Sequence, residues 1–168
     1  MVRRLGSEEL RRDPRDGHLL ARDRFGQLTH AAIGDLVAHN HRGGADVVAA
    51  VTRTLTHHDS ANPALRRRLT AAVSSYAKEF APRGATLIGA ELTVGGQRLD
   101  LVWRASHVVW ADELKSAGDR LTVETARQCA RQVKAARAHW SDAFFGVRIV
   151  WLQTPGRQLW VGYRQESR

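Results

Sequence analysis

The sequence predicts an α/β (α+β) fold in which N-terminal helices are followed by a mixed sheet of about five strands. Apolar residues recur at helical spacing between residues 27 and 81, and three β-rich runs surround the pair Gly95-Gly96. A second helical stretch then precedes two more β-rich runs. The 168 residues are 43% hydrophobic and 26% charged, which is typical of one globular domain with a sizeable core.

The first part of the chain is expected to contain an arm and three helices. Residues 1–26 mix seven arginines with five acids, which favours a weakly ordered basic arm with about one helical turn. Residues 27–168 form the single domain, with a helical part over 27–81 and a sheet core over 84–163. Breaks at Gly43-Gly44 and Asn62-Pro63 divide the helical part, and Pro82 and Gly84 end its last helix.

The glycine pair predicts a two-residue hairpin turn and thereby fixes a register. If Val94 faces Gln97 across the turn, Glu91 faces Asp100. Because strand side chains alternate between faces, these two carboxylates lie opposite the apolar face. The residues expected on that apolar core face are Ile88, Ala90, Leu92, Val94, Leu99, Leu101 and Trp103.

Two carboxylates directly opposite each other destabilise a hairpin unless a cation lies beside them. A bound divalent metal ion would meet this need. The next strand, roughly residues 108–116, places Glu113 and Lys115 on one face and Trp110 and Leu114 on the other. A carboxylate and an ammonium group therefore project together from that strand.

A helix is expected from about Thr122 to Trp140, followed by strands over 147–153 and 158–163. Its apolar stripe packs on the sheet, and Glu124, Gln128 and Gln132 form a polar stripe at a spacing of four. The helix therefore acts as a crossover between the three-stranded meander and two further strands.

Asp100, Glu113 and Lys115 follow the pattern Asp-x(n)-(Asp/Glu)-x-Lys, which resembles the core motif of the PD-(D/E)XK nuclease superfamily. Glu91 matches the additional acid that many members carry on the preceding strand. The resemblance covers roughly residues 27–163 and implies a restriction-endonuclease-like core. Because an acid two places before a lysine is common by chance, the hairpin register strengthens the match.

The resemblance implies a magnesium site. In the superfamily the acidic residues and the backbone carbonyl between the Glu and the Lys coordinate the metal, which corresponds here to Asp100, Glu113, Leu114 and Glu91. Magnesium prefers hard oxygen ligands, and Mn²⁺ is expected to substitute for it. Lys115 would orient or activate water and stabilise charge on the phosphate, because an amine can be tuned whereas arginine stays protonated.

The RecB-type branch of the superfamily adds two features. A glutamine on the helix after the catalytic strand corresponds to Gln128, which is therefore a candidate catalytic residue, although Gln132 stands where tyrosine often follows. A histidine four residues after a glycine on an early helix often ligates the metal. Gly34 is followed by Ala38 at that spacing and by His39 one residue later. Solvated helix positions are the alternative for Gln128 and His39.

Together these features predict a magnesium-dependent nuclease that hydrolyses phosphodiester bonds of DNA. The formal net charge of +9 favours a polyanionic partner, and DNA is favoured over RNA. Three alternatives remain open. They are a ribonuclease or toxin-type effector of the same fold, a catalytically silent nucleic-acid-binding module, and a structural protein whose acidic strand face is an ion-pair ladder.

The remaining expectations concern location and assembly. Cys129 is the only cysteine, and the N-terminus lacks the apolar run of a signal peptide, so a cytoplasmic protein is expected. No stretch is long and apolar enough to predict a membrane span. A chain of this length without a recognition domain of its own suggests a homodimer or a larger complex.

Overall fold

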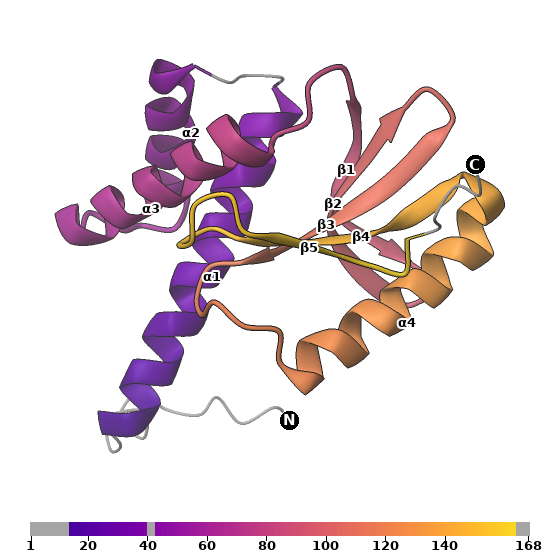
Figure 1. The fold of residues 1–168 in the computed structure, drawn as a ribbon. Coiled ribbons are helices and arrows are strands. Elements are labelled where there is room, and N and C mark those ends of the chain that lie inside the picture. Colours follow the sequence, from indigo (N-terminus) through magenta and orange to yellow (C-terminus); the bar gives the residue numbers. More distant parts are fainter. Residues whose placement is uncertain (1–13, 40–42, 164–168) are drawn as a thin grey trace, which may run out of the picture.

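A computed structural model of the chain describes residues 14–39 and 43–163 and confirms the predicted fold class (Figure 1). Helices precede a five-stranded mixed sheet, and one helix separates its third and fourth strands. The main elements are α1 (Pro14–Ala38), α2 (Gly44–His57), α3 (Pro63–Ser75), β1 (Thr86–Val94), β2 (Gln97–Ala105), β3 (Val108–Lys115), α4 (Val123–Trp140), β4 (Phe144–Trp151) and β5 (Gln158–Val161). A π-helical turn, η2 (Tyr76–Phe80), follows α3, and a 3-10 turn, η3 (Ser141–Ala143), follows α4.

Within the segment 1–26, where a basic arm was expected, residues 14–26 form the first half of α1. Residues 1–13 lie outside the described residues. Proline suits the first helical position, because its missing N–H has no intrahelical partner there, and Pro14 begins α1. The buried face of α1 also starts earlier than expected, since Phe25 and Leu28 are both buried and lie one turn apart.

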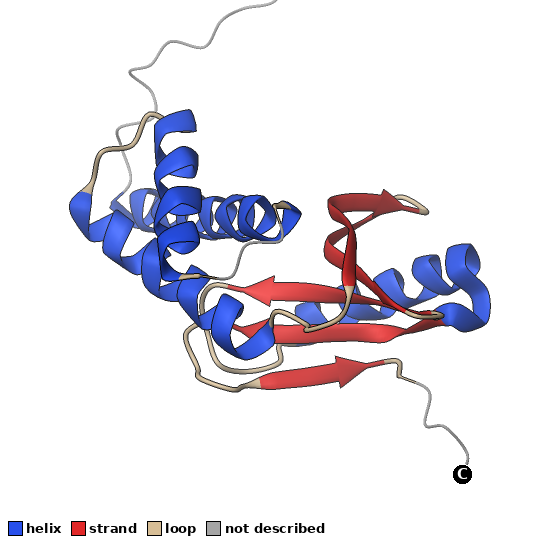
Figure 2. Ribbon diagram, turned by 90° about the horizontal axis from the view of Figure 1, so that it is seen from above, coloured by secondary structure: helices blue, strands red, loops and turns tan. Residues whose placement is uncertain are grey.

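The sheet has the strand order β1-β2-β3-β4-β5, with β3 and β4 parallel and the other neighbours antiparallel. α4 makes the crossover between the parallel strands, as predicted. Helices α1–α3 pack on one face of the sheet and α4 on the other, so two separate hydrophobic cores result. Figure 2 shows the α1–α3 group at one end of the sheet and α4 along its far side.

The predicted hairpin register is confirmed near the turn, where Val94 pairs with Gln97 and Leu92 pairs with Leu99. Gly95 has φ = 52° and Gly96 has φ = 73°, which is the backbone that a tight hairpin turn demands at both central positions. The same register places Glu91 opposite Asp100, although Glu91 itself has φ = 52° and the pairing shifts between Leu87 and Gly89.

The predicted core face of this hairpin is only partly right. Val94, Leu99, Leu101 and Trp103 are buried, Leu92 is half-buried, and Ile88 and Ala90 are exposed. β1 is an edge strand, and its irregular backbone interrupts the alternation of side chains. In β2, Leu99 packs in the core beside α4, whereas Leu101 packs in the core beside α1–α3. The side chains of β2 therefore change from one face of the sheet to the other at Asp100.

Among the described residues, no helix combines the length and the apolar character that crossing a membrane requires.

Candidate functional site

Three side chains from three elements gather into a group able to hold a metal ion. They are His30 of α1, Glu91 of β1 and Asp100 of β2, and one ligand atom of each lies within 4.8 Å of the other two. The predicted proximity of Glu91 and Asp100 is therefore confirmed. Asp100 is buried, His30 is half-buried and Glu91 is exposed, so the group reaches from the core of the fold to its surface.

Asp100 is held where β2 and β3 separate. The pairing of these strands ends at Leu101 and Asp112, and the Asp100 carboxylate instead accepts the backbone N–H of Leu114 at 2.8 Å. Its other oxygen lies 3.5 Å from His30 Nδ1. Burial raises the pKa of Asp100, but the hydrogen bond and charge of His30 and the Leu114 N–H outweigh it, so the pKa is lowered. Asp100 is thus an ionised carboxylate at neutral pH.

His30 bridges Asp100 and the backbone of β3. Its Nε2 donates to the Leu114 carbonyl oxygen at 3.0 Å, since a carbonyl can only accept, and its Nδ1 faces Asp100. Burial lowers the pKa of His30, but Asp100 and the Leu114 carbonyl outweigh it and raise the pKa above 6.5. The Asp100 carboxylate thus favours the protonated form of His30.

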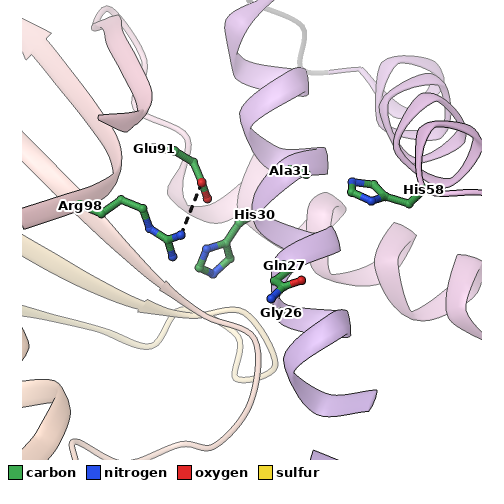
Figure 3. Close-up of a pocket in the computed structure, with 7 residues that line it drawn as sticks. All are labelled: Gly26, Gln27, His30, Ala31, His58, Glu91 and Arg98. Carbon is green, nitrogen blue, oxygen red and sulfur yellow. Dashed lines mark ion pairs between the residues drawn. The ribbon is translucent and has the colours of Figure 1, made fainter. Parts of the chain in front are cut away.

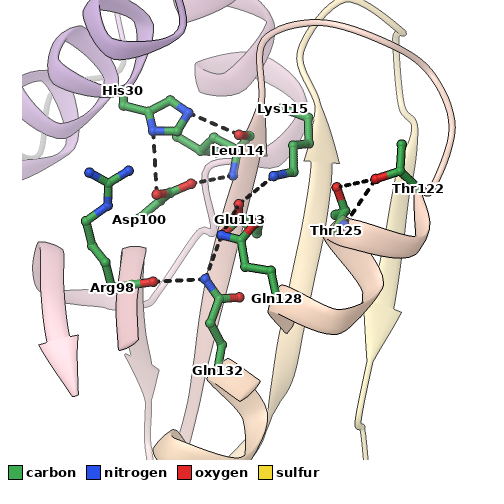
Figure 4. Close-up of polar contacts among 10 residues, drawn as sticks. All are labelled: His30, Arg98, Asp100, Glu113, Leu114, Lys115, Thr122, Thr125, Gln128 and Gln132. Carbon is green, nitrogen blue, oxygen red and sulfur yellow. Dashed lines mark hydrogen bonds and ion pairs between the residues drawn. The ribbon is translucent and has the colours of Figure 1, made fainter. Parts of the chain in front are cut away.

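Glu113 and Lys115 form the second half of the site (Figure 4). The Glu113 carboxylate is buried, and its Oε1 accepts from Lys115 Nζ at 2.7 Å and from Gln128 Nε2 at 2.9 Å. Its Oε2 accepts from Gln132 Nε2 at 2.7 Å. These bonds fix the carboxylate, whereas the Lys115 side chain remains 24% exposed and can reach a bound molecule.

α4 supplies the two glutamines because its polar stripe faces Glu113. The Thr122 side chain accepts the N–H of Thr125 and caps the helix, and residues four apart then share one face. Gln132 also donates to the Arg98 carbonyl oxygen at 2.9 Å, so one amide links β2 and β3. The expected position of Gln128 beside the site is confirmed, and Gln132 has the same surroundings.

The two halves meet at Leu114. Its N–H binds Asp100 and its carbonyl oxygen binds His30, while its chain neighbours Glu113 and Lys115 face α4. Of the four predicted metal ligands, Glu91 and Asp100 belong to the group with His30. The Leu114 carbonyl oxygen binds His30 Nε2, and its role as a ligand stays a prediction. The oxygens of Glu113 are engaged by Lys115 and the two glutamines, and its role as a ligand stays a prediction.

A pocket of about 590 Å³ opens beside the metal-ligand group (Figure 3). Its lining residues are Gly26, Gln27, His30, Ala31, His58, Glu91 and Arg98. The Arg98 guanidinium lies 3.6 Å from the Glu91 carboxylate. A ligand in this pocket would therefore contact two of the three metal-ligand residues directly.

The sequence prediction missed His30. The expected pattern, a histidine four residues after a glycine, was sought at Gly34. The same spacing separates Gly26 from His30, but Gly26 lies in the segment that was expected to be an arm. A Cβ at Gly26 would lie only 3.1 Å from Ser116 Oγ, so glycine allows α1 to approach the loop after β3. His39 lies about 13 Å further along the helix axis, and its Nδ1 contacts the Asp35 carbonyl oxygen instead.

A second buried acid, Asp112, has a different environment. Its carboxylate accepts from Tyr76 Oη at 2.7 Å, from Trp103 Nε1 at 3.1 Å, and from Nε and Nη2 of Arg148 at 2.8 and 2.7 Å. Arg148 also donates to the Phe80 carbonyl oxygen at 2.9 Å. The Asp112 side chain has no exposed surface, so this network ties η2 to the sheet and offers no site for a ligand.

Comparison with known proteins gives no family for this chain. It matches no model of a protein family and no curated protein sequence at a significant level. Inference about its function therefore depends on the residues described above.

Proposed function

We propose that the protein is a magnesium-dependent nuclease of the PD-(D/E)XK type that hydrolyses phosphodiester bonds of DNA. The observation that carries the proposal is the gathering of His30, Glu91 and Asp100 beside the same strand end that presents Glu113 and Lys115. A metal-ligand group, a fixed carboxylate and an ammonium group are the parts that metal-assisted hydrolysis of a phosphodiester needs.

The donor set fits a hard divalent cation. Glu91 and Asp100 offer carboxylate oxygens, and His30 contributes a ring nitrogen. Oxygen donors suit Mg²⁺ and Mn²⁺. Such an ion, when bound, would lower the pKa of a coordinated water and neutralise charge on the phosphate.

The chain's own residues would supply the rest of the chemistry. Lys115 would stabilise the negative charge that develops on the phosphate and orient the attacking water. Glu113 holds the Lys115 ammonium group at 2.7 Å, and Gln128 and Gln132 hold Glu113. The two glutamines are thus positioning residues, and Lys115 is the group that reaches the substrate.

The net charge of +9 supports a nucleic acid as the substrate, because lysine and arginine side chains release counterions from a phosphate backbone. Binding of the chain to DNA should accordingly weaken as the salt concentration rises.

The proposal predicts that the purified protein cleaves DNA when Mg²⁺ or Mn²⁺ is added and stops when a chelator is added. Plasmid DNA, single-stranded DNA and RNA should be digested in parallel, and DNA is expected to be cleaved faster than RNA. Asp100→Asn should lose the activity, because it removes the buried carboxylate of the metal-ligand group. Faster cleavage of RNA would identify a ribonuclease, and cleavage of neither polymer would contradict the proposal.

A further inference from the structure

Arg98 projects from the strand that carries Asp100, two residues before it, and lines the pocket beside the metal-ligand group (Figure 3). Its backbone carbonyl oxygen is fixed by the Gln132 amide, which also binds Glu113. Its side chain is 59% exposed. The backbone of Arg98 is therefore held within the site, while its guanidinium group extends into the mouth of the pocket.

The contact between Arg98 and Glu91 is weak. Arg98 Nη1 lies 3.6 Å from Glu91 Oε2, which is longer than the roughly 2.8 Å of a good charge-assisted hydrogen bond. Glu91 is 49% exposed, so water screens the pair on both sides. A guanidinium group has five donors in a planar fork, and this contact leaves that fork available to a second anion.

We propose that Arg98 binds a phosphate group of the substrate in this pocket and that its weak contact with Glu91 is given up when a metal ion binds that carboxylate. The inference rests on the proposed function, because it takes Glu91 as a metal ligand and a phosphodiester as the substrate. Once Glu91 ligates a cation, its negative charge is neutralised and attracts Arg98 less. The Arg98 guanidinium group then turns to the phosphate. Metal binding therefore frees the Arg98 guanidinium group to bind the phosphate.

The residue type and the pocket agree with this role. Arginine matches two phosphate oxygens with two parallel N–H donors, whereas lysine acts as a point charge. A volume of about 590 Å³ lies within the range of small-molecule pockets and is large enough for a phosphate with its adjoining nucleotide. His58 and Gln27 line the same pocket on the helical side and would contact that nucleotide.

The test compares Arg98→Ala and Arg98→Lys with Arg104→Ala, which removes the same charge near the far end of β2. Mn²⁺ affinity is measured by calorimetry, and KM and kcat are measured on single-stranded DNA at saturating Mg²⁺. Arg98→Ala should raise KM about tenfold or more and leave the Mn²⁺ affinity unchanged or higher, because a competing cation is removed from Glu91. The KM of Arg98→Lys should lie between the KM of Arg98→Ala and that of the wild type. The KM of Arg104→Ala should equal that of the wild type.

Two results would overturn the role of Arg98: an unchanged KM in Arg98→Ala, or a parallel loss of Mn²⁺ affinity and activity, which would show that Arg98 only maintains the site. Arg98→Lys keeps the charge and most of the side chain, so it tests KM even if Arg98→Ala folds poorly. Absence of metal-dependent cleavage in the wild type would instead contradict the proposed function itself.

Discussion

Replacing Lys115 with methionine is expected to lower kcat for magnesium-dependent DNA cleavage by at least about a hundredfold. Methionine keeps a similar length and removes the ammonium group that Glu113 holds at 2.7 Å. Without that group, the charge that develops on the phosphate loses the ammonium group that we propose stabilises it. KM should change little, because we place this interaction mainly in the transition state.

The matched control is Lys78→Met, which removes an exposed lysine from η2, the turn that joins α3 to the sheet. Its kcat should equal that of the wild type. Lys115→Met also leaves the buried Glu113 with only its two glutamine partners, so its thermal unfolding and Mn²⁺ affinity should be measured alongside. A folded, metal-binding Lys115→Met protein with wild-type kcat would contradict the proposed role of Lys115.

Asp112→Ala is expected to lower the free energy of unfolding by about 3–5 kcal/mol. The substitution leaves the Arg148 guanidinium, whose side chain is only 11% exposed, without its carboxylate, and Tyr76 and Trp103 lose their acceptor. Burial and the Asp112 charge raise the pKa of Tyr76 well above 10, so its hydroxyl keeps its proton and needs an acceptor. Urea denaturation followed by circular dichroism measures the effect.

Asp119→Ala is the control for this loss of stability. Asp119 is 62% exposed and lies 3.8 Å from an exposed Arg120, so its removal should change the free energy of unfolding by no more than about 0.5 kcal/mol. If Asp112→Ala proved as stable as this control, the network around Arg148 would not be what ties η2 to the sheet.

The hairpin shows what local sequence can predict about this site. Gly95-Gly96 determines the turn, the turn determines the register, and the register brings Glu91 opposite Asp100. Each of these steps involves residues close together in the chain, where backbone geometry alone restricts the outcome. The site position of Gln128, by contrast, was implied by the family resemblance, and the helical spacing of four only placed it on one stripe with Gln132.

The residues that escaped prediction depend on contacts between distant segments. His30 meets Leu114 across 84 positions, and the pairing requires α1 to pack against the end of β3. Asp112 meets Arg148 only because β3 and β4 run parallel in a register that the crossover through α4 sets. Strand alternation by itself does not reveal the arginine that neutralises Asp112.

Gln132 differs from the pattern of the nucleases that the sequence resembles, and its contacts are informative. It occupies the position where tyrosine often follows the glutamine, and its amide binds both Glu113 and the Arg98 carbonyl oxygen. The side chain thus positions one residue of the site and anchors the strand that carries another. Only the packing of α4 on β2 and β3 reveals this double role.

The most direct measurement of the central claim is a calorimetric titration of the metal-free protein with Mn²⁺ and Mg²⁺. The wild type should bind at least one ion per chain, Asp100→Asn should bind it at least about tenfold more weakly, and Glu124→Gln, an exposed acid on α4, should bind like the wild type. Absence of binding in the wild type, or equal affinity in Asp100→Asn, would contradict a metal site at His30, Glu91 and Asp100.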